Sequence, residues 1–332
     1  MLLIRTYSIW KDRIAAALLS FLFIPFTLNA QTNIVLVRDT TLMGSKFQLT
    51  IVTTDISQGN KLIDTAIAEI NRIENLISEW RPYTKVSEIN RNAGIQPVKV
   101  NNELYDLTKR AINYSWMSNG AFDISTAAMD KVWVFDGSMI EKPTTEIISK
   151  SIQYVGFEHI VLDSINSTIY LSQEGMKIGF GSIGKGYAAD KARELLQSLG
   201  VKGGIVNASG DIATWGTQPN GKPWRIGINN PFKRHGIAKV LKLKENAVAT
   251  SGSYEKYAEI DGVRYAHIIN PKTGYPSTGL TSVTIYGPSA EFANALSTSI
   301  MVLGEKEGKK LVKKYPRYKF LFITDKGKII KR

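Results

Sequence analysis

The amino-acid sequence predicts an α+β fold, a single compact unit of antiparallel sheets with packed helices. Short segments with strand periodicity follow one another in pairs, joined by turn residues, and only isolated segments carry the hydrophobic spacing of a helix. A doubly wound Rossmann sheet would need strands and helices in regular alternation, which the sequence lacks. No internal repeat, low-complexity tract or linker divides residues 31–332, so we expect one domain there.

The first elements of this domain are expected to be a hairpin and two helices. Residues 33–54 alternate as two strands around a turn at 43–45. Apolar residues recur at helical spacing over residues 60–80, and a second helix is expected over 103–118, where an Asn-Gly pair follows as a C-cap. The sequence of residues 120–126 predicts a turn that is followed by an extended segment.

The later elements are expected to be mostly strands. A third helix is predicted over residues 144–154, and three short β runs over 159–182. A helix is expected to begin at about Lys185, and residues 203–276 continue as strands and loops. The segment 282–304 has the pattern of a strand, a Gly-Pro break and a helix.

The N-terminus has the pattern of an export signal. Basic residues precede an apolar run over residues 14–28. A transmembrane anchor is the alternative, but it would need about 20 apolar residues, and Pro25 interrupts the run. We therefore expect residues 1–30 to be a signal peptide cleaved near Ala30, and the mature chain to work in the periplasm or at the outer face of the inner membrane. The chain has no cysteine, which excludes a lipobox, disulfides and thiolate chemistry.

The formal net charge of +13 suits a polyanion, an anionic membrane surface or a phosphorylated cofactor. The charge is high in residues 304–320, which have the pattern of a solvated helix face. The basic residues match no nucleic-acid recognition motif, so no nucleic-acid partner is expected. No H-E-x-x-H motif is present, which excludes that class of metalloprotease.

One glycine-rich stretch nearly matches two nucleotide-binding motifs. Gly179, Gly181 and Gly184 fit the G-x-G-x-x-G of a dinucleotide-binding turn, but the next strand ends without the acidic residue that should follow. A P-loop would need Ser or Thr at the position of Gly186. One feature of a phosphate site is still present, because Lys185 lies at a predicted helix N-terminus, where phosphate binding is favoured. The alternative is that the glycines only allow close packing of the backbone.

Further motifs accompany this stretch in a fixed order. They are MGSKF, SEW, GAFDIS, SIGKGYAADKA, NASGD, GSYEKY, HIINPKTGYP and ANALSTSIMVLG. Taken together, from about Gly44 to Gly304, they resemble the ApbE family of FAD:protein FMN transferases. The resemblance implies an ApbE-like, T-fold-like unit and an enzyme that acts on a flavin nucleotide.

The resemblance also implies a reaction. Members of the family split the pyrophosphate of FAD, with Mg²⁺, attach FMN by a phosphoester to a threonine of a target protein and release AMP. The implied partner is an acceptor protein with a threonine flavinylation motif, such as a subunit of a membrane redox pump. This chemistry needs cations beside the diphosphate and a base beside the attacking threonine.

Particular residues take roles by this resemblance. Lys185 can neutralise phosphate charge, and His267 has a titratable nitrogen in the range of a general base, although a single histidine is more often structural than catalytic. Both are expected catalytic residues. The FAD site is expected to contain Met43, Trp80, Ala121, Phe122, Asp123, Lys185 and Ile268. The Mg²⁺ site is expected to contain Ser182, Asn294 and Thr298.

Three acidic residues of the family pattern are replaced in this chain. Asn294 stands where the family has a metal-binding Asp, four residues before Thr298 on the same helix face. Gly179 and Asn270 stand at the other two Asp positions. Protein Mg²⁺ sites usually include a carboxylate, so these replacements are expected to affect metal binding. The sequence offers two substitute carboxylates without choosing between them, Glu291 and Asp211.

The sequence therefore favours an exported FAD:protein FMN transferase. Two alternatives follow from Asn294. The chain can be a flavoprotein that binds FAD without splitting it, or a pyrophosphatase that hydrolyses FAD to FMN and AMP without transfer. The capacity for metal at Asn294 and Thr298 discriminates between an enzyme and a binding protein.

Overall fold

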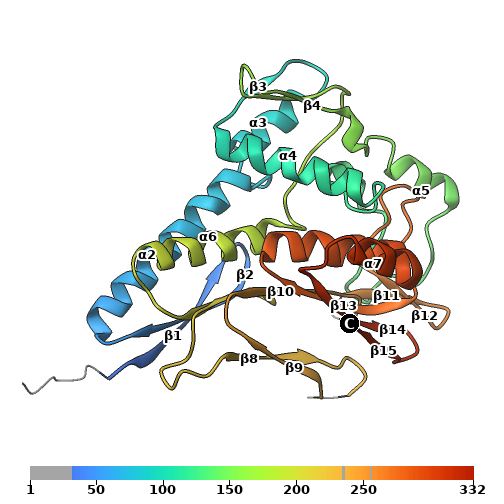
Figure 1. The fold of residues 1–332 in the computed structure, drawn as a ribbon. Coiled ribbons are helices and arrows are strands. Elements are labelled where there is room, and N and C mark those ends of the chain that lie inside the picture. The colour runs from blue at the N-terminus through green and yellow to red at the C-terminus, as the bar shows by residue number, and fades with distance from the viewer. Residues whose placement is uncertain (1–31, 234–235, 255) are drawn as a thin grey trace, which may run out of the picture. The chain divides into compact units, whose positions relative to one another are not determined.

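An antiparallel sheet of eight strands organises the fold (Figure 1). The computed structural model describes residues 32–233, 236–254 and 256–332. From one edge to the other, the sheet contains β1 (Ile34–Leu42), β2 (Ser45–Thr53), β6 (Gly204–Ala208), β7 (Asp211–Trp215), β10 (Asn246–Gly252), β13 (Leu280–Gly287), β14 (Lys319–Thr324) and β15 (Ile329–Lys331). Every neighbouring pair is antiparallel. The predicted α+β class is confirmed, and the sheet is not that of a Rossmann fold.

Residues Ile34–Arg332 form one compact unit. The predicted signal peptide, residues 1–30, lies outside the described residues, and its cleavage stays a prediction. Among the residues that the structure describes, no helix has the length and apolar character needed to cross a membrane.

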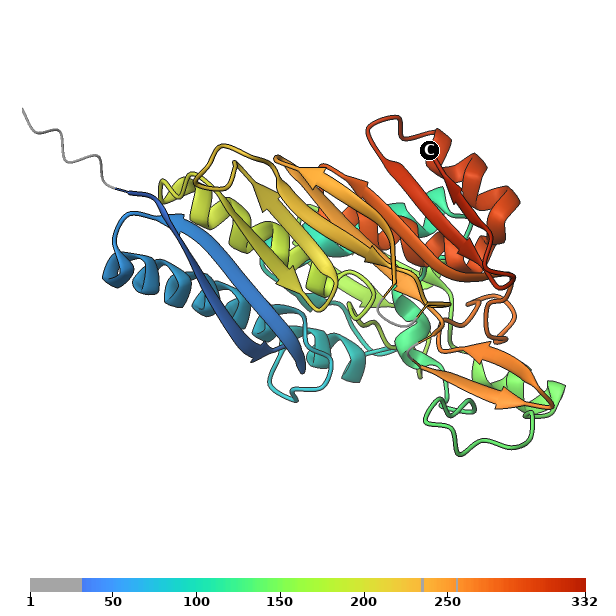
Figure 2. The same cartoon turned by 90° about the horizontal axis from the view of Figure 1, so that it is seen from below.

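Helices α2 (Ile56–Ile77), α6 (Gly184–Ser198) and α7 (Ala290–Lys313) cover one face of this sheet (Figures 1 and 2). α6 lies between α2 and α7 and packs against both. The predicted apolar face of α2 is buried in the main core, which gives this amphipathic helix its orientation. Its buried side chains include Ile63, Ala66, Ile70, Ile73 and Ile77.

A hairpin covers part of the opposite face of the sheet (Figure 1). It consists of β8 (Trp224–Asn229) and β9 (Ile237–Leu243). Ile228, Leu241 and Leu243 of this hairpin are buried against β10, β13 and β14. The central strands are therefore covered on both sides, and β13 is buried along most of its length.

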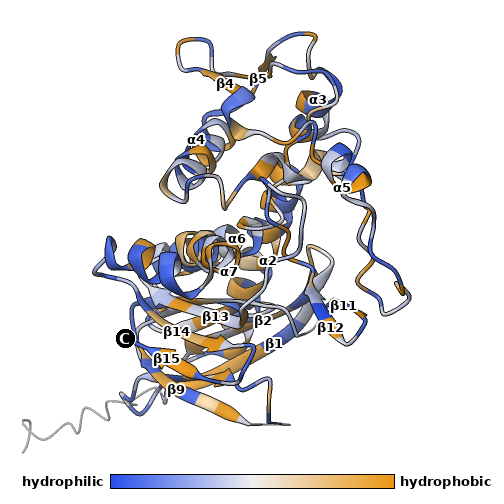
Figure 3. Cartoon of the chain, turned by 90° about the vertical axis from the view of Figure 1, so that its right-hand side faces the viewer, coloured by the Kyte–Doolittle hydropathy of each residue, from blue (hydrophilic) through white to orange (hydrophobic). Residues whose placement is uncertain are grey.

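An outer layer lies beyond the three helices, on their side away from the large sheet (Figure 3). It contains α3 (Lys85–Arg91), α4 (Asn102–Met117) and a small sheet of β3 (Val98–Lys99), β5 (Thr168–Leu171) and β4 (Ile160–Asp163). The chain between these parts includes the short helices η1 (Ile124–Ala128), α5 (Thr145–Ser151) and η2 (Phe157–His159). A second hairpin, β11 (Tyr257–Ile260) and β12 (Val263–Ala266), packs through Ala258 and Ile260 against Trp133 and Ile148.

Most of the expected elements are present. The hairpin around 43–45 and the helices near 60–80, 103–118 and 144–154 are confirmed, with boundaries moved by a few residues. α7 extends beyond the expected end, because the chain continues helically after the non-helical backbone of Gly304.

Two local expectations were wrong. Residues 124–128 form the short helix η1 rather than extended chain, because the Asp123 side chain caps its first turn. The third β run expected before Gly181 is not a strand. Its backbone is held instead by the side chain of Asn90, which both donates to and accepts from Ile178, at 3.0 and 2.8 Å.

Candidate active site

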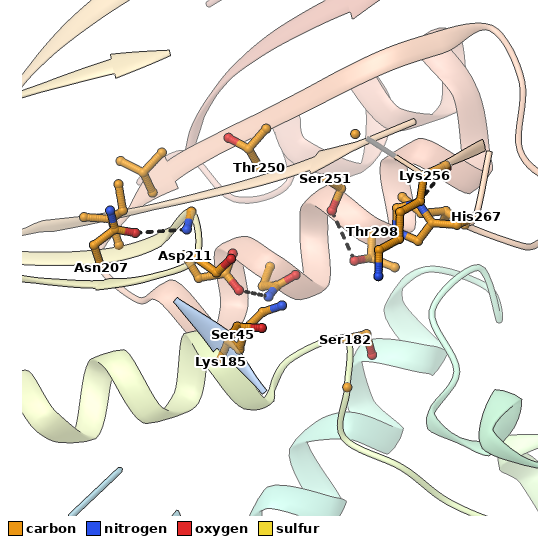
Figure 4. A pocket seen from close by; sticks show the side chains of 18 of the residues that line it. Ser45, Ser182, Lys185, Asn207, Asp211, Thr250, Ser251, Lys256, His267 and Thr298 are labelled. Atoms are coloured by element: carbon orange, nitrogen blue, oxygen red, sulfur yellow. Dashed lines mark hydrogen bonds between the residues drawn. The ribbon is translucent and has the colours of Figure 1, made fainter. Parts of the chain in front are cut away.

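A cavity of about 1080 Å³ lies where the beginnings of α6 and α7 meet the β6–β7 turn (Figure 4). Ligand pockets usually enclose about 300–1,000 Å³, so this cavity is large enough for an extended ligand. β8, the end of β10 and the segment 267–271 complete its wall. Most of the predicted site residues line it. They are Ala121, Phe122, Asp123, Ser182, Lys185, His267, Ile268, Asn294 and Thr298.

The glycines on either side of Lys185 bring helices together. A Cβ at Gly186 would lie 2.6 Å from the carbonyl oxygen of Ala290, and one at Gly184 would lie 2.6 Å from the Ile77 side chain. Glycine is therefore required at position 186 for the first turn of α6 to contact the start of α7, whereas a larger residue at position 184 would have to displace the end of the Ile77 side chain on α2. This close packing places Lys185 and Asn294 on the wall of one cavity.

The start of α7 is fixed by its neighbour. The Asp190 carboxylate on α6 accepts hydrogen bonds from the Ser289 hydroxyl at 2.7 Å and from the backbone of Glu291 at 3.0 Å. A negative side chain at a helix N-terminus also interacts favourably with the helix dipole. The position of Asn294, one turn further along, is thus determined by the contact between α6 and α7.

Asp211 is a buried carboxylate on the cavity wall. Its carboxylate accepts a hydrogen bond from Nδ2 of Asn294, which Figure 4 marks with a dashed line. Burial raises the pKa of Asp211 to about 7, and the nearby positive charge of Lys185 acts in the opposite direction. Additional positive charge near this carboxylate would therefore stabilise its ionised form.

The other candidate carboxylate, Glu291, does not line the cavity. It accepts hydrogen bonds from Arg110 at 2.8 and 3.0 Å and from the Tyr114 hydroxyl at 2.8 Å. These partners hold it against α4. Of the two carboxylates that the sequence left open, the geometry favours Asp211.

Asp123 has a different environment. Burial raises its pKa, and its carboxylate accepts from the backbone and hydroxyl of Ser125, both at 2.7 Å, and from the backbone of Phe157 at 3.0 Å. Both carboxylate oxygens are thus engaged. Asp123 shapes the wall of the cavity by holding η1 and the chain near Phe157.

His267 lies exposed at the edge of the cavity. Its Nδ1 is 3.2 Å from the backbone carbonyl oxygen of Lys256. Because a carbonyl oxygen can only accept, this contact places a proton on Nδ1.

Thr298 and Ser251 face each other across α7 and β10, with their hydroxyl oxygens 3.3 Å apart. In Figure 4 these hydroxyls, Ser182, Lys185 and Asp211 lie around one space. The available donors are carboxylate, amide and hydroxyl oxygens, which are the ligands that Mg²⁺ prefers. No group of three or more His, Cys, Asp or Glu side chains able to hold a metal occurs among the described residues. The oxygens of Asp211, Asn294 and Thr298 are of the kind that would hold a Mg²⁺ on this wall.

Two predicted site residues lie away from this cavity. Met43 occupies the β1–β2 turn with φ of 50°, and its backbone N–H donates to Glu74 at 3.4 Å. Trp80 is 75% exposed and lines an adjoining cavity of about 850 Å³. The ammonium of Lys131 lies 5.2 Å from the centre of the Trp80 ring. Three residues line both cavities, namely Thr126, Met129 and Ile269.

The remaining two replacements of acidic residues have local explanations. A Cβ at Gly179 would lie 2.6 Å from a carboxylate oxygen of Glu79. The space beside Gly179 is therefore filled by the carboxylate of a residue from another segment of the chain. Asn270 does not line the cavity; its Oδ1 accepts from the backbone of Lys272 at 2.9 Å in a turn that Asp or Asn can form. Only the replacement at Asn294 lies on the cavity wall.

Sequence reasoning gave no role to several cavity residues. Lys46 and Lys256 add positive charge to the wall, and each belongs to one of the quoted motifs, MGSKF and GSYEKY. The β8 residues 226–229 carry no local signal, because they reach the cavity through long-range packing of the hairpin.

Comparison with known proteins agrees with the sequence motifs. A model of the ApbE family matches residues 43–322. A FAD:protein FMN transferase of Treponema pallidum is 32% identical over 268 residues, 75% of this chain and 73% of that protein. A FAD:protein FMN transferase of Klebsiella pneumoniae is 27% identical over 283 residues, 83% of this chain and 81% of that protein.

Solved structures resemble the fold closely. The ApbE protein of Thermotoga maritima has a TM-score of 0.81 and 31% identity, covering 90% of this chain and 97% of that one. The flavin transferase ApbE of Vibrio cholerae has a TM-score of 0.78 and 26% identity, with the same coverage of both chains.

Proposed function

The chain belongs to the ApbE family, and on that premise we propose that it is an FAD:protein FMN transferase. It acts on FAD and on a protein acceptor, as the names of its relatives state for them. The observation that carries the proposal is the convergence of motifs far apart in the sequence on one cavity. Lys185, His267 and Asn294 come from three separate segments and lie on its wall.

The finer parts of the proposal concern the bond and the acceptor. The acceptor group is a threonine hydroxyl, and the products are a phosphoester-linked FMN and AMP. His267 accepts the hydroxyl proton at Nε2 as the oxygen attacks the phosphorus of the FMN half, and the bond to the bridging oxygen of AMP breaks. The acceptor carries its own threonine motif and can be a subunit of a membrane redox pump.

The positive charge of the cavity supports this assignment. Lys185 is at the first turn of α6, where backbone N–H groups and the helix dipole also favour phosphate. Lys46 and Lys256 add further positive charge to the same wall. Mg²⁺ bound at Ser182, Asn294 and Thr298 would neutralise charge on the diphosphate oxygens during cleavage. The volume of the cavity agrees with an extended dinucleotide.

We also propose that the protein works after export, in the periplasm or at the outer face of the inner membrane. The basic and apolar N-terminal residues support this location. Fractionation of cells that produce the full chain tests it. Recovery of a shortened protein in the periplasmic fraction agrees with the proposal, and recovery of the whole chain in the cytoplasm contradicts it.

The experiment for the activity uses the purified mature chain, FAD, Mg²⁺ and a protein that the Vibrio cholerae transferase flavinylates. Mass spectrometry of the acceptor should show one added FMN at a threonine, and a Thr→Val acceptor should remain unmodified. FAD that stays bound and intact supports the alternative of a flavin-binding protein. Equal FMN and AMP release with the acceptor unmodified supports the alternative of a pyrophosphatase.

A further inference from the structure

Asp211 carries a buried carboxylate whose role the reaction described above leaves open. It is 5% exposed and lies on the cavity wall beside Asn294, which is 8% exposed. We propose that Asp211 is a direct ligand of the divalent cation, and that Asn294 positions it. In this chain the carboxylate of the metal site then comes from the β6–β7 turn instead of from α7.

Among the residues that the structure describes, three carboxylates line the cavity, and two of them are unsuited to this role. Both oxygens of Asp123 are engaged by Ser125 and Phe157. Asp39 is exposed on β1, and its Oδ1 accepts from the side chain of Gln48 at 3.0 Å. Asp211 is the one whose carboxylate is buried and turned toward the start of α7.

The bonding of Asp211 is incomplete for a buried charge. An ionised carboxylate offers about four acceptor positions, and the Asn294 amide satisfies one of them with a neutral donor. Asp211 forms no ion pair among the residues that the structure describes. A buried carboxylate without an ionic partner is costly, and a cation would remove that cost.

A rigid turn holds Asp211 in place. Ser209 and Gly210, the two residues before it, have φ of 55° and 103°, and the Asn207 side chain accepts from the backbone of Gly210 at 2.9 Å. Ala208 and Asp211 are paired across the β6–β7 hairpin. The carboxylate is therefore positioned before any ligand binds, which is a property of binding residues supported by packing and hydrogen bonds.

This inference rests on the proposed function, in which the cavity binds Mg²⁺. Its test measures metal binding and does not require catalytic turnover. Mn²⁺ alone is titrated into the mature protein, and free Mn²⁺ is followed by its electron paramagnetic resonance signal. Asp211→Asn keeps the size of the side chain and removes its charge. Asp39→Asn removes one charge from the same cavity wall and serves as the matched control.

The expected result is a loss of Mn²⁺ affinity of at least about 10-fold in Asp211→Asn, since even the outer-shell partners of metal ligands are worth about 10- to 100-fold. Asp39→Asn should stay within about twofold of the unmodified protein. The double variant Asp211→Asn with Asn294→Asp returns the carboxylate from the side of α7 and should recover binding. Equal Mn²⁺ affinity in Asp211→Asn and the unmodified protein overturns the inference, as does an unmodified protein that binds no Mn²⁺.

A further variant covers the case in which Asp211→Asn does not fold. Asn294→Asp alone leaves Asp211 in place and adds a second carboxylate beside it, so Mn²⁺ affinity should rise by about tenfold or more. Unchanged affinity in this variant contradicts a cation site between the two residues. FMN transfer is measured separately and reports on the proposed function. If the protein transfers FMN but its Mn²⁺ affinity does not depend on Asp211, only the inference is refuted. If its Mn²⁺ affinity depends on Asp211 but no FMN is transferred, only the proposed function is refuted.

Discussion

The substitution Glu291→Gln tests whether this carboxylate is structural. Glu291 is 6% exposed and accepts two hydrogen bonds from Arg110 and one from Tyr114. Loss of one member of a buried ion pair costs about 3–5 kcal/mol, whereas exposed pairs contribute about 0–1 kcal/mol. Because the Arg110 side chain is 39% exposed and can be solvated, we expect a loss of about 2 kcal/mol.

The assay is thermal and urea unfolding of Glu291→Gln beside the unmodified protein. In domains of 150–250 residues about 1 kcal/mol changes Tm by about 2–4 °C, so Tm should fall by about 4–8 °C. Mn²⁺ affinity and FMN transfer below the transition should change by less than about threefold, because the side chain does not reach the cavity. A large loss of Mn²⁺ affinity with unchanged Tm would refute the reasoning and make Glu291 the metal ligand.

Four further predictions concern the cavity and its surroundings. Lys185→Gln should weaken FAD binding, measured by flavin fluorescence, by about 10- to 100-fold, because the variant lacks the cation expected beside the diphosphate, and the effect should be smaller at high salt. Equal FAD affinity in the variant and the unmodified protein would contradict the placement of Lys185 beside the diphosphate. His267→Asn should lower the rate of FMN transfer by about 100- to 10,000-fold while FAD affinity is kept, and an unchanged rate would exclude it as the base. Gly179→Asp should destabilise the fold by about 1–3 kcal/mol in urea unfolding, because the new Cβ would meet the Glu79 carboxylate, and adding Glu79→Ala should restore part of the loss. The pKa of Glu103 is lowered from 4.5, chiefly by its hydrogen bond from Arg72, so its ionic contribution to stability is present above pH 4.5 and is lost as the pH falls through the lowered pKa. Glu103→Gln should therefore be less stable than the unmodified protein at pH 7, and the difference should shrink as the pH falls below 4.5.

The fold was predictable where the pattern is local. The hairpin turn at 43–45 and the buried face of α2 follow from alternation and helical spacing in the sequence itself. The short helix η1 was missed because its first turn depends on the side-chain cap of Asp123. The run before Gly181 was mistaken for a strand because Asn90, distant in the sequence, satisfies its backbone.

The candidate site was predictable only through the combination of motifs. The glycines before Lys185 suggested a phosphate loop, but the structure shows that Gly184 and Gly186 allow α6 to pack against its neighbours. The sequence could not choose between Asp211 and Glu291, since their difference lies in their partners. Contacts between segments far apart along the chain decide which carboxylate reaches the cavity.

The measurement that tests the central claim most directly is the stoichiometry of a single reaction. The mature protein is mixed with FAD, Mg²⁺ and an acceptor protein, and AMP, free FMN and acceptor-bound FMN are quantified in the same sample. The account predicts one acceptor-bound FMN for each AMP, with little free FMN, and no AMP when Mg²⁺ is chelated. AMP without acceptor-bound FMN, or intact FAD throughout, would contradict the assignment of this chain as an FMN transferase.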